Sequence, residues 1–224
     1  MQLTYVERRH LAFKHPFTCM IAGPTSSGKT VLLRNILKEF KLTIFFNKTP
    51  DKLKILWAYG QWQELYNTKI PLCDIEYIEG LPNEEEIKEC NPHLIVLDDL
   101  MSELGNNVKL ANLFTKGSHH MNISVIFITQ NLFHQGSQMR TISLNCHYLL
   151  LLKSVRDKNQ IATLGNQLHP NNSKFFIEAY NDATSKNYGY LKVDLKNNTP
   201  DKYRYQTDII PVNNKLSPIA YTPK

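Results

Sequence analysis

Short runs of apolar residues, many of them β-branched, alternate along the chain with stretches whose apolar residues recur at helical spacing. This alternation is typical of a parallel sheet with helices on its faces. The expected strands are residues 18–22, 55–59, 75–78, 94–99, 124–130, 147–153 and 188–193. The expected helices are residues 31–40, 81–90, 108–117, 157–168 and 173–184. The pattern therefore predicts an α/β fold with a mainly parallel sheet flanked by helices.

Domain organisation follows from the same pattern, which shows no internal repeat and no long linker. We expect residues 1–224 to form one domain. The polar tail beyond about residue 199 is rich in Asn, Lys and Pro, and we interpret it as a candidate extended arm. No apolar run approaches the roughly 18–20 residues that cross a bilayer, and charge stands where a signal peptide is apolar. We therefore expect an intracellular protein without a membrane partner.

One strand-to-helix junction carries the most specific motif of the chain. Gly23, Gly28, Lys29 and Thr30 complete the Walker A pattern G-x-x-x-x-G-K-T between an apolar strand and an amphipathic helix. The glycines let successive backbone N–H groups point at phosphate oxygens, and the following helix presents its positive N-terminal end to the same anion. The motif predicts that residues 23–30 hold the phosphates of ATP.

Each position of this loop has an expected role. Lys29 bridges the β- and γ-phosphates, and Thr30 ligates Mg²⁺ through its hydroxyl. The amides of the loop crest wrap the phosphates, and the remaining loop residues are Pro24, Thr25, Ser26 and Ser27. The competing interpretation is an ordinary glycine-containing turn, which the complete match in this context disfavours.

Two carboxylates follow the apolar run that begins at residue 94. Asp98 and Asp99 lie where a Walker B acid must lie to reach a metal beside the phosphate loop. We assign Asp98 to the Mg²⁺ side and Asp99 to orienting or deprotonating the attacking water. The alternative is a helix cap or a turn, and it applies most strongly to Asp99.

The next expected strand ends at Gln130, beside the strand of Asp98. Gln130 is a candidate sensor of the γ-phosphate, or it positions water; alternatively it merely terminates the strand. Phosphoryl transfer often uses an arginine from a neighbouring subunit. Arg140 is the first candidate for this trans arginine and Arg156 the second, although either could be a surface charge or a DNA contact.

Charge and aromatic residues add weaker signals. Lys and Arg number 26 against 20 Asp and Glu, giving a net charge of +6 that suits a polyanionic partner such as nucleic acid. The aromatic group Trp57, Tyr59, Trp62 and Tyr66 could stack on bases, but packing within the fold is the better-supported interpretation.

With these motifs in place, the chain resembles the viral genome-packaging ATPases of the FtsK-HerA superfamily, especially those of Polinton/Maverick elements and adintovirus-like viruses. The resemblance covers roughly residues 10–170. Its segments are FKHPFTCMIAGPTSSGKT, HLIVLDDLM, KGSHHMNISVIFITQNLF and RTISLNCHYLLLLKSVRDKNQI. Lys29, Thr30, Asp98 and Gln130 fall on family motif positions, whereas many members of the wider superfamily carry Glu at the position of Asp99.

The resemblance implies a RecA-like (ASCE) P-loop NTPase fold assembled into a homo-oligomeric ring. ATP then lies between subunits, and double-stranded DNA of any sequence passes through the ring into a preformed capsid. A capsid vertex or portal protein is an implied partner, and an infected host cell or virus assembly site the implied location, with nucleus or cytoplasm left open.

Three other functions remain compatible with the motifs. The first is a DNA translocase or helicase of a cellular or transposable element. The second is a small-molecule kinase, although no Arg-rich lid segment is evident in the sequence. The third is a nucleotide-dependent interaction protein without hydrolysis, which the intact Lys29, Thr30 and Asp98 disfavour.

Overall fold

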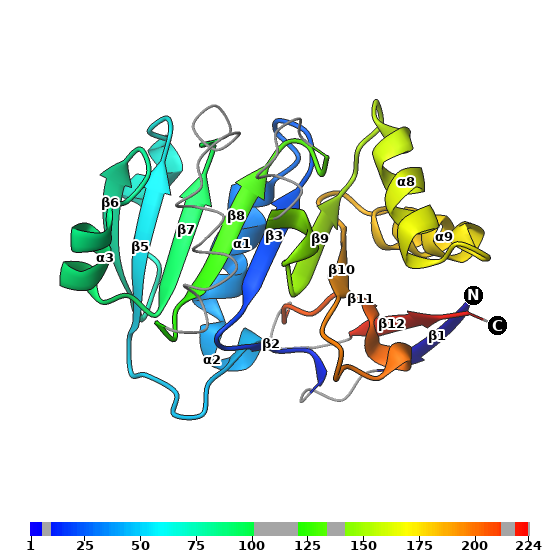
Figure 1. Ribbon diagram of the computed structural model, residues 1–224, viewed down its shortest axis with the longest axis horizontal. Helices are drawn as coiled ribbons and strands as arrows, with labels where there is room; N and C mark the ends of the chain where they lie inside the picture. Colours follow the sequence, from blue (N-terminus) through cyan, green and yellow to red (C-terminus); the bar gives the residue numbers. More distant parts are fainter. Residues whose placement is uncertain (6–9, 101–120, 134–141, 212–217, 224) are drawn as a thin grey trace.

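The predicted strands adjoin one another in a single sheet (Figure 1). The computed structural model describes residues 1–5, 10–100, 121–133, 142–211 and 218–223. Six neighbouring strands run parallel, in the order β9 (Tyr148–Leu152), β3 (Thr18–Ala22), β8 (Ser124–Thr129), β7 (Leu94–Asp98), β5 (Leu53–Tyr59) and β6 (Cys73–Glu79). This arrangement confirms the predicted α/β class with a mainly parallel sheet.

Antiparallel strands extend the sheet beyond β9. They follow in the order β10 (Tyr190–Asp194), β11 (Tyr205–Thr207), β12 (Ile219–Thr222) and β1 (Gln2–Tyr5). A separate parallel pair consists of β2 (Phe13–Lys14) and β4 (Ile44–Phe45). The first and last described strands are thus neighbours, and both termini lie at the edge of the sheet opposite β6 (Figure 1).

Helices cover both faces of the sheet because successive side chains of each buried strand point to opposite sides. In β8, Phe127 packs in the layer of α3 (Glu84–Cys90), α8 (Lys158–Leu168) and α9 (Ser173–Ala183). Its neighbour Ile126 packs in the layer of α1 (Lys29–Lys38) and α2 (Phe40–Thr43). The sheet is therefore the middle of three layers with a core on each face.

Local sequence signals fix the starts of two helices, α3 (Glu84–Cys90) and α8 (Lys158–Leu168). Asn83 and Glu86 form a capping box at the beginning of α3, and Asp157 accepts a hydrogen bond from the Gln160 N–H at the beginning of α8. The predicted helix 31–40 is divided at Glu39 into α1 and α2. The predicted helix 108–117 lies outside the described residues.

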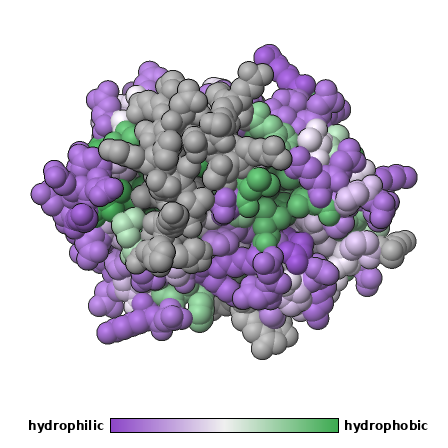
Figure 2. Space-filling model, viewed as in Figure 1, coloured by the Kyte–Doolittle hydropathy of each residue, from purple (hydrophilic) through white to green (hydrophobic). Residues whose placement is uncertain are grey.

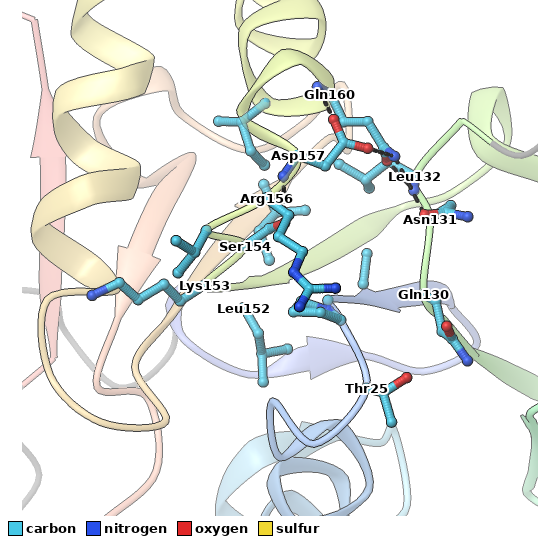
Figure 3. A pocket seen from close by; sticks show the side chains of 16 residues that line it. Thr25, Gln130, Asn131, Leu132, Leu152, Lys153, Ser154, Arg156, Asp157 and Gln160 are labelled. Carbon is cyan, nitrogen blue, oxygen red and sulfur yellow. Dashed lines mark hydrogen bonds between the residues drawn. The ribbon is translucent and has the colours of Figure 1, made fainter.

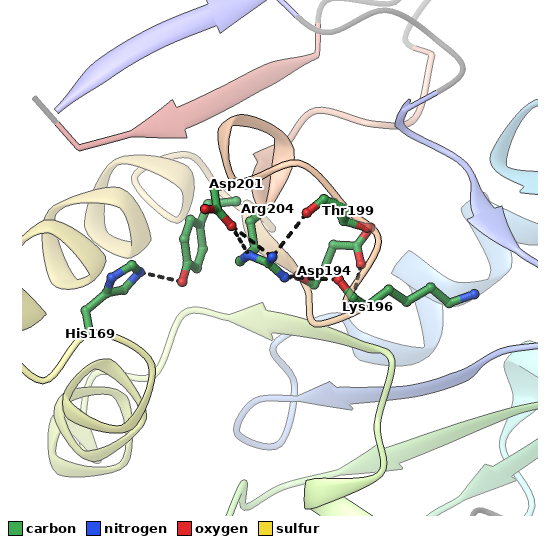
Figure 4. Close-up of polar contacts among 7 residues, drawn as sticks. His169, Asp194, Lys196, Thr199, Asp201 and Arg204 are labelled. Atoms are coloured by element: carbon green, nitrogen blue, oxygen red, sulfur yellow. Dashed lines mark hydrogen bonds and ion pairs between the residues drawn. The ribbon is translucent and has the colours of Figure 1, made fainter.

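The C-terminal segment differs from the extended arm considered from about residue 199. It passes through η4 (Asp201–Tyr203) and contributes β11 and β12 to the sheet. Arg204 stabilises the loop that connects β10 to β11 (Figure 4). Its guanidinium donates to three backbone oxygens and one carboxylate: Asp194 O at 2.9 Å, Lys196 O at 3.2 Å, Thr199 O at 3.1 Å and the Asp201 carboxylate at 2.9 Å. The sequence did not predict these two strands, because each is only three or four residues long and lies in a segment of polar composition.

The described surface on the face seen in Figure 1 is mainly hydrophilic, and apolar side chains show near its middle (Figure 2). Among the described helices, none combines the length and the apolar character needed to cross a membrane.

Phe127 provides a test of the core. Its side chain is fully buried, so we expect Phe127→Ala to lower the free energy of unfolding by about 3–5 kcal/mol through loss of contacts and creation of a cavity. Urea unfolding followed by circular dichroism measures this change. Phe45, which is 58% exposed, supplies the control, and Phe45→Ala should change the same quantity by about 0.5 kcal/mol or less. Equal losses in both variants would contradict the packing described.

Candidate functional site

The Walker A residues form a loop between the carboxyl end of β3 and the start of α1. The loop is tied to the neighbouring strand because the Gly23 N–H donates to Thr129 O at 3.3 Å. Gly28 precedes α1 with a φ of 91°, a left-handed conformation that glycine adopts without strain. Helix α1 has no side-chain cap and no acidic residue in its first turn. Its N-terminal N–H groups and positive dipole end are therefore available to an anion.

Lys29 folds back into this loop. Its ammonium donates to Gly23 O at 2.8 Å and to Pro24 O at 2.9 Å. Burial lowers the pKa of Lys29, while the nearby carboxylates of Asp98 and Asp99 raise it. The lysine charge is thus held at the loop by backbone carbonyl groups that an incoming phosphate can replace.

Ser27 leaves a second polar group at the loop. Within the part of the chain that the structure describes, its buried Oγ has no hydrogen-bond partner. Buried hydroxyl groups normally have a partner, and a phosphate oxygen is an acceptor of the required kind. The donors of the loop therefore fit a phosphate group.

Asp98 lies opposite the loop at the carboxyl end of β7. The residue is only 2% exposed. Its Oδ2 accepts hydrogen bonds from Thr30 Oγ1 at 3.3 Å and from Tyr66 OH at 2.8 Å. Burial raises the pKa of Asp98, whereas the hydrogen bonds from Tyr66 and Thr30 lower it. Burial and the charge of Asp98 raise the pKa of Tyr66. The phenol therefore stays protonated and donates a hydrogen bond to the carboxylate. A hydroxyl and a carboxylate at this separation match the hard oxygen ligands that Mg²⁺ prefers.

Asp99 does not continue β7, in contrast to the predicted strand 94–99. It adopts a left-handed conformation with a φ of 56°, and it is exposed. Gly60 makes this turn possible, because a Cβ atom at Gly60 would lie 2.2 Å from Asp99 O. The turn separates the buried Asp98 from an exposed carboxylate next to it.

Most of the predicted site residues line one cavity of about 590 Å³, whereas Gly23 and Pro24 line a neighbouring one. Lys29, Thr30, Asp98, Asp99 and Gln130 line it, together with residues 25, 26 and 28 of the loop. Gln130 reaches it because β8 lies between β3 and β7, as expected from its place beside the strand of Asp98. The structure thus brings together the loop after β3, the carboxylates at the end of β7 and the end of the intervening strand β8.

A second cavity, of about 610 Å³, lies on another side of the loop (Figure 3). It shares Thr25 and Gln130 with the first cavity, and it is also lined by Lys153 and Arg156. The guanidinium of Arg156 points toward the phosphate loop of its own chain (Figure 3). The other candidate arginine, Arg140, lies outside the described residues.

Sequence reasoning missed three residues that line the first cavity or contact its carboxylate. Trp62 lines the cavity and is 47% exposed, and Tyr188 lines it beside Gly28. Tyr66 binds Asp98 from a 3-10 turn, η2 (Glu64–Asn67). Trp62 and Tyr66 carried an aromatic signal in the sequence, but no spacing rule connects that signal to a carboxylate 32 positions later.

No protein-family model and no curated protein matches the sequence. Solved structures do match. The genome packaging NTPase B204 from Sulfolobus turreted icosahedral virus 2, in complex with sulfate, aligns with a TM-score of 0.54 and 11% identity over 83% of this chain and 94% of that one. Its complex with ATP-gammaS gives 0.54 and 12% over 82% and 94%. B204, the DNA-packaging ATPase from Sulfolobus turreted icosahedral virus, gives 0.53 and 13% over 81% and 94%.

At 11–13% identity these likenesses establish the fold. The chain has the mostly parallel, helix-flanked sheet of the RecA-like P-loop NTPases, as predicted.

Gly60 tests the geometry of the carboxylate turn. We expect Gly60→Ala to lower the free energy of unfolding by about 1–3 kcal/mol, because the added methyl group meets a backbone oxygen that cannot move away freely. Thermal unfolding measures the loss. The exposed neighbour Gln61 serves as control, and Gln61→Ala should change stability by about 0.5 kcal/mol or less. A Gly60 variant as stable as the control would mean that the turn differs from the one described.

Proposed function

We propose that this protein is an ATP-hydrolysing motor that moves double-stranded DNA into a preformed viral capsid. One observation carries the ATPase part: the Thr30 hydroxyl and the Asp98 carboxylate, from different elements, meet at 3.3 Å beside the phosphate loop. A loop that only connected a strand to a helix would not require a buried carboxylate facing its final threonine. This pairing supports an Mg²⁺–ATP site formed by residues 23–30 and Asp98.

In this proposal Lys29 exchanges its two backbone carbonyl partners for oxygens of the β- and γ-phosphates. Thr30 and Asp98 would hold Mg²⁺, and the bound ion would supply neutralisation of the charge on the phosphates. The amides of residues 25–28 and the first turn of α1 bind the remaining phosphate oxygens. The unpartnered Ser27 hydroxyl and the uncapped helix support this assignment.

We assign activation of the attacking water to residues on the exposed side of the same cavity. Asp99 orients or deprotonates the attacking water, and Gln130 senses the γ-phosphate from the end of β8. Both residues line the cavity beside Lys29. We retain Arg140 as the trans arginine, while the orientation of Arg156 favours a contact with the nucleotide of its own chain.

The motor part of the proposal has separate support. The structural neighbours are described as a genome packaging NTPase and a DNA-packaging ATPase, and the chain carries a net charge of +6. A packaging motor grips the DNA backbone without reading bases, and phosphate contacts by Lys and Arg are sufficient for that purpose. A head-to-tail ring places each nucleotide beside a neighbouring subunit, and a capsid vertex or portal protein completes the assembly inside an infected cell.

Lys29 tests the ATPase part. We expect Lys29→Ala to reduce ATP hydrolysis roughly 100-fold or more, because the cation that stabilises the transferred phosphoryl group is lost. Steady-state release of phosphate measures the rate. Lys88, exposed on α3 and remote in sequence from the motif, is the control, and Lys88→Ala should hydrolyse ATP at the unmodified rate. Equal hydrolysis by both variants would rule out the proposed phosphate site.

DNA tests the motor part. We expect double-stranded DNA of unrelated sequences to stimulate ATP hydrolysis to the same extent, and the stimulation to weaken as salt increases because counterions compete for the phosphates. The measurement compares phosphate release with and without DNA over a salt series. If the protein forms a ring and its rate of ATP hydrolysis is the same with and without DNA, the motor function is wrong. That result would favour a kinase or a nucleotide-dependent switch.

A further inference from the structure

A buried phenol reaches the carboxylate of the proposed Mg²⁺ site from outside both Walker motifs. Tyr66 OH donates to Asp98 Oδ2 at 2.8 Å, which is shorter than the 3.3 Å contact from Thr30. We propose that Tyr66 is the positioning residue that orients Asp98 toward Mg²⁺. The inference rests on the proposed Mg²⁺–ATP site and adds to it a residue that the phosphate motifs do not contain.

The position of Tyr66 is fixed by aromatic neighbours. Its ring stacks on Tyr77 with centroids 5.2 Å apart and planes inclined by 25°, and it meets Trp62 edge-on at 5.4 Å. Trp57 and Tyr59 pack at 5.5 Å and 5.8 Å. Aromatic contacts of this kind restrict the ring to one orientation. The phenol oxygen is thereby held at the carboxylate.

The backbone of the same segment is anchored independently. The guanidinium of Arg34, a buried residue of α1, donates to Thr68 O immediately after η2. Since α1 begins with Lys29 and Thr30, one helix carries the metal-facing hydroxyl and also fixes the segment that carries Tyr66. The phenol and the phosphate loop are therefore held in a defined relation.

In this geometry the two residues that donate hydrogen bonds to Asp98, Thr30 and Tyr66, have different roles. Thr30 and Asp98 would together hold Mg²⁺, with the Thr30 hydroxyl serving as a ligand in place of its bond to Asp98. Tyr66 belongs to η2, outside residues 23–30, where aromatic rings pack around it, and it keeps its bond. Partners that orient a metal-binding carboxylate commonly change metal affinity 10- to 100-fold when they are removed. Tyr66 contacts neither the phosphates nor the reacting water in this proposal, so its effect is confined to the metal.

Tyr66→Phe tests the inference because it removes one hydroxyl and keeps the ring that packs in the cluster. We expect the Mg²⁺ concentration for half-maximal ATP hydrolysis to rise roughly 10-fold or more, with a smaller change in kcat at saturating Mg²⁺. A readout without turnover is Mn²⁺ affinity of the complex with a non-hydrolysable ATP analogue, measured by electron paramagnetic resonance, which should fall by a similar factor. Binding of the analogue in EDTA should not change.

Tyr77→Phe is the matched control, since Tyr77 stacks on Tyr66 and, among the described residues, makes no hydrogen bond to Asp98. It should keep the unmodified Mg²⁺ and Mn²⁺ dependence. A Tyr66→Phe protein that melts normally and has unchanged Mn²⁺ affinity would overturn the inference. Equal losses in both variants would also overturn it, because they would indicate a packing effect. Failure of the proposed function is distinct: the unmodified protein would then neither hydrolyse ATP nor bind Mn²⁺ with the analogue.

Discussion

Hydrogen bonding of β8 to both β3 and β7 determines the geometry on which the site depends. Parallel pairing brings Ala22 opposite Thr129 and Asp98 opposite Ile128, so the carboxyl ends of the three strands coincide at one edge of the sheet. The phosphate loop, Gln130 and Asp98 follow directly from those ends. Since each strand is buried on both faces, its register cannot shift by one residue without exchanging the side chains of the two cores.

The same arrangement requires a carboxylate to be buried at the end of β7. A buried charge is costly unless it is paired or hydrogen-bonded, and Asp98 is only 2% exposed. Tyr66 and Thr30 supply hydrogen bonds, and Lys29 supplies a positive charge nearby. The aromatic cluster around Tyr66 is consequently a structural support and part of the electrostatic environment of Asp98. Packing at the β5 side of the sheet and chemistry at the phosphate loop are thus connected through the hydroxyl of Tyr66.

The sequence predicted the central sheet and the strand–loop–helix junction at residues 23–30 well because long apolar runs and the spacing of the glycines are local signals. It extended three strands one residue too far, past the ends of β7 at Asp98, β8 at Thr129 and β9 at Leu152. The left-handed turn at Asp99, which ends β7, depends on a tertiary contact, the close approach of Gly60. The short strands β11 and β12 left no periodic pattern and were interpreted as an arm. The bond between Tyr66 and Asp98 joins distant positions, which a single sequence does not reveal. The site roles of residues 23–30, Asp98, Asp99, Gln130 and the arginines stay predictions.

Pairing of β1 with β12 has a consequence for folding during synthesis. Gln2 lies opposite Thr222, so β1 is synthesised long before the strand with which it pairs. The parallel strands around the phosphate loop can assemble while that edge is still incomplete. In the interval β1 is a free strand with unpaired backbone groups, available to a second nascent chain. The pairing of β1 with β12 is therefore the folding step at which nascent chains on neighbouring ribosomes would exchange strands.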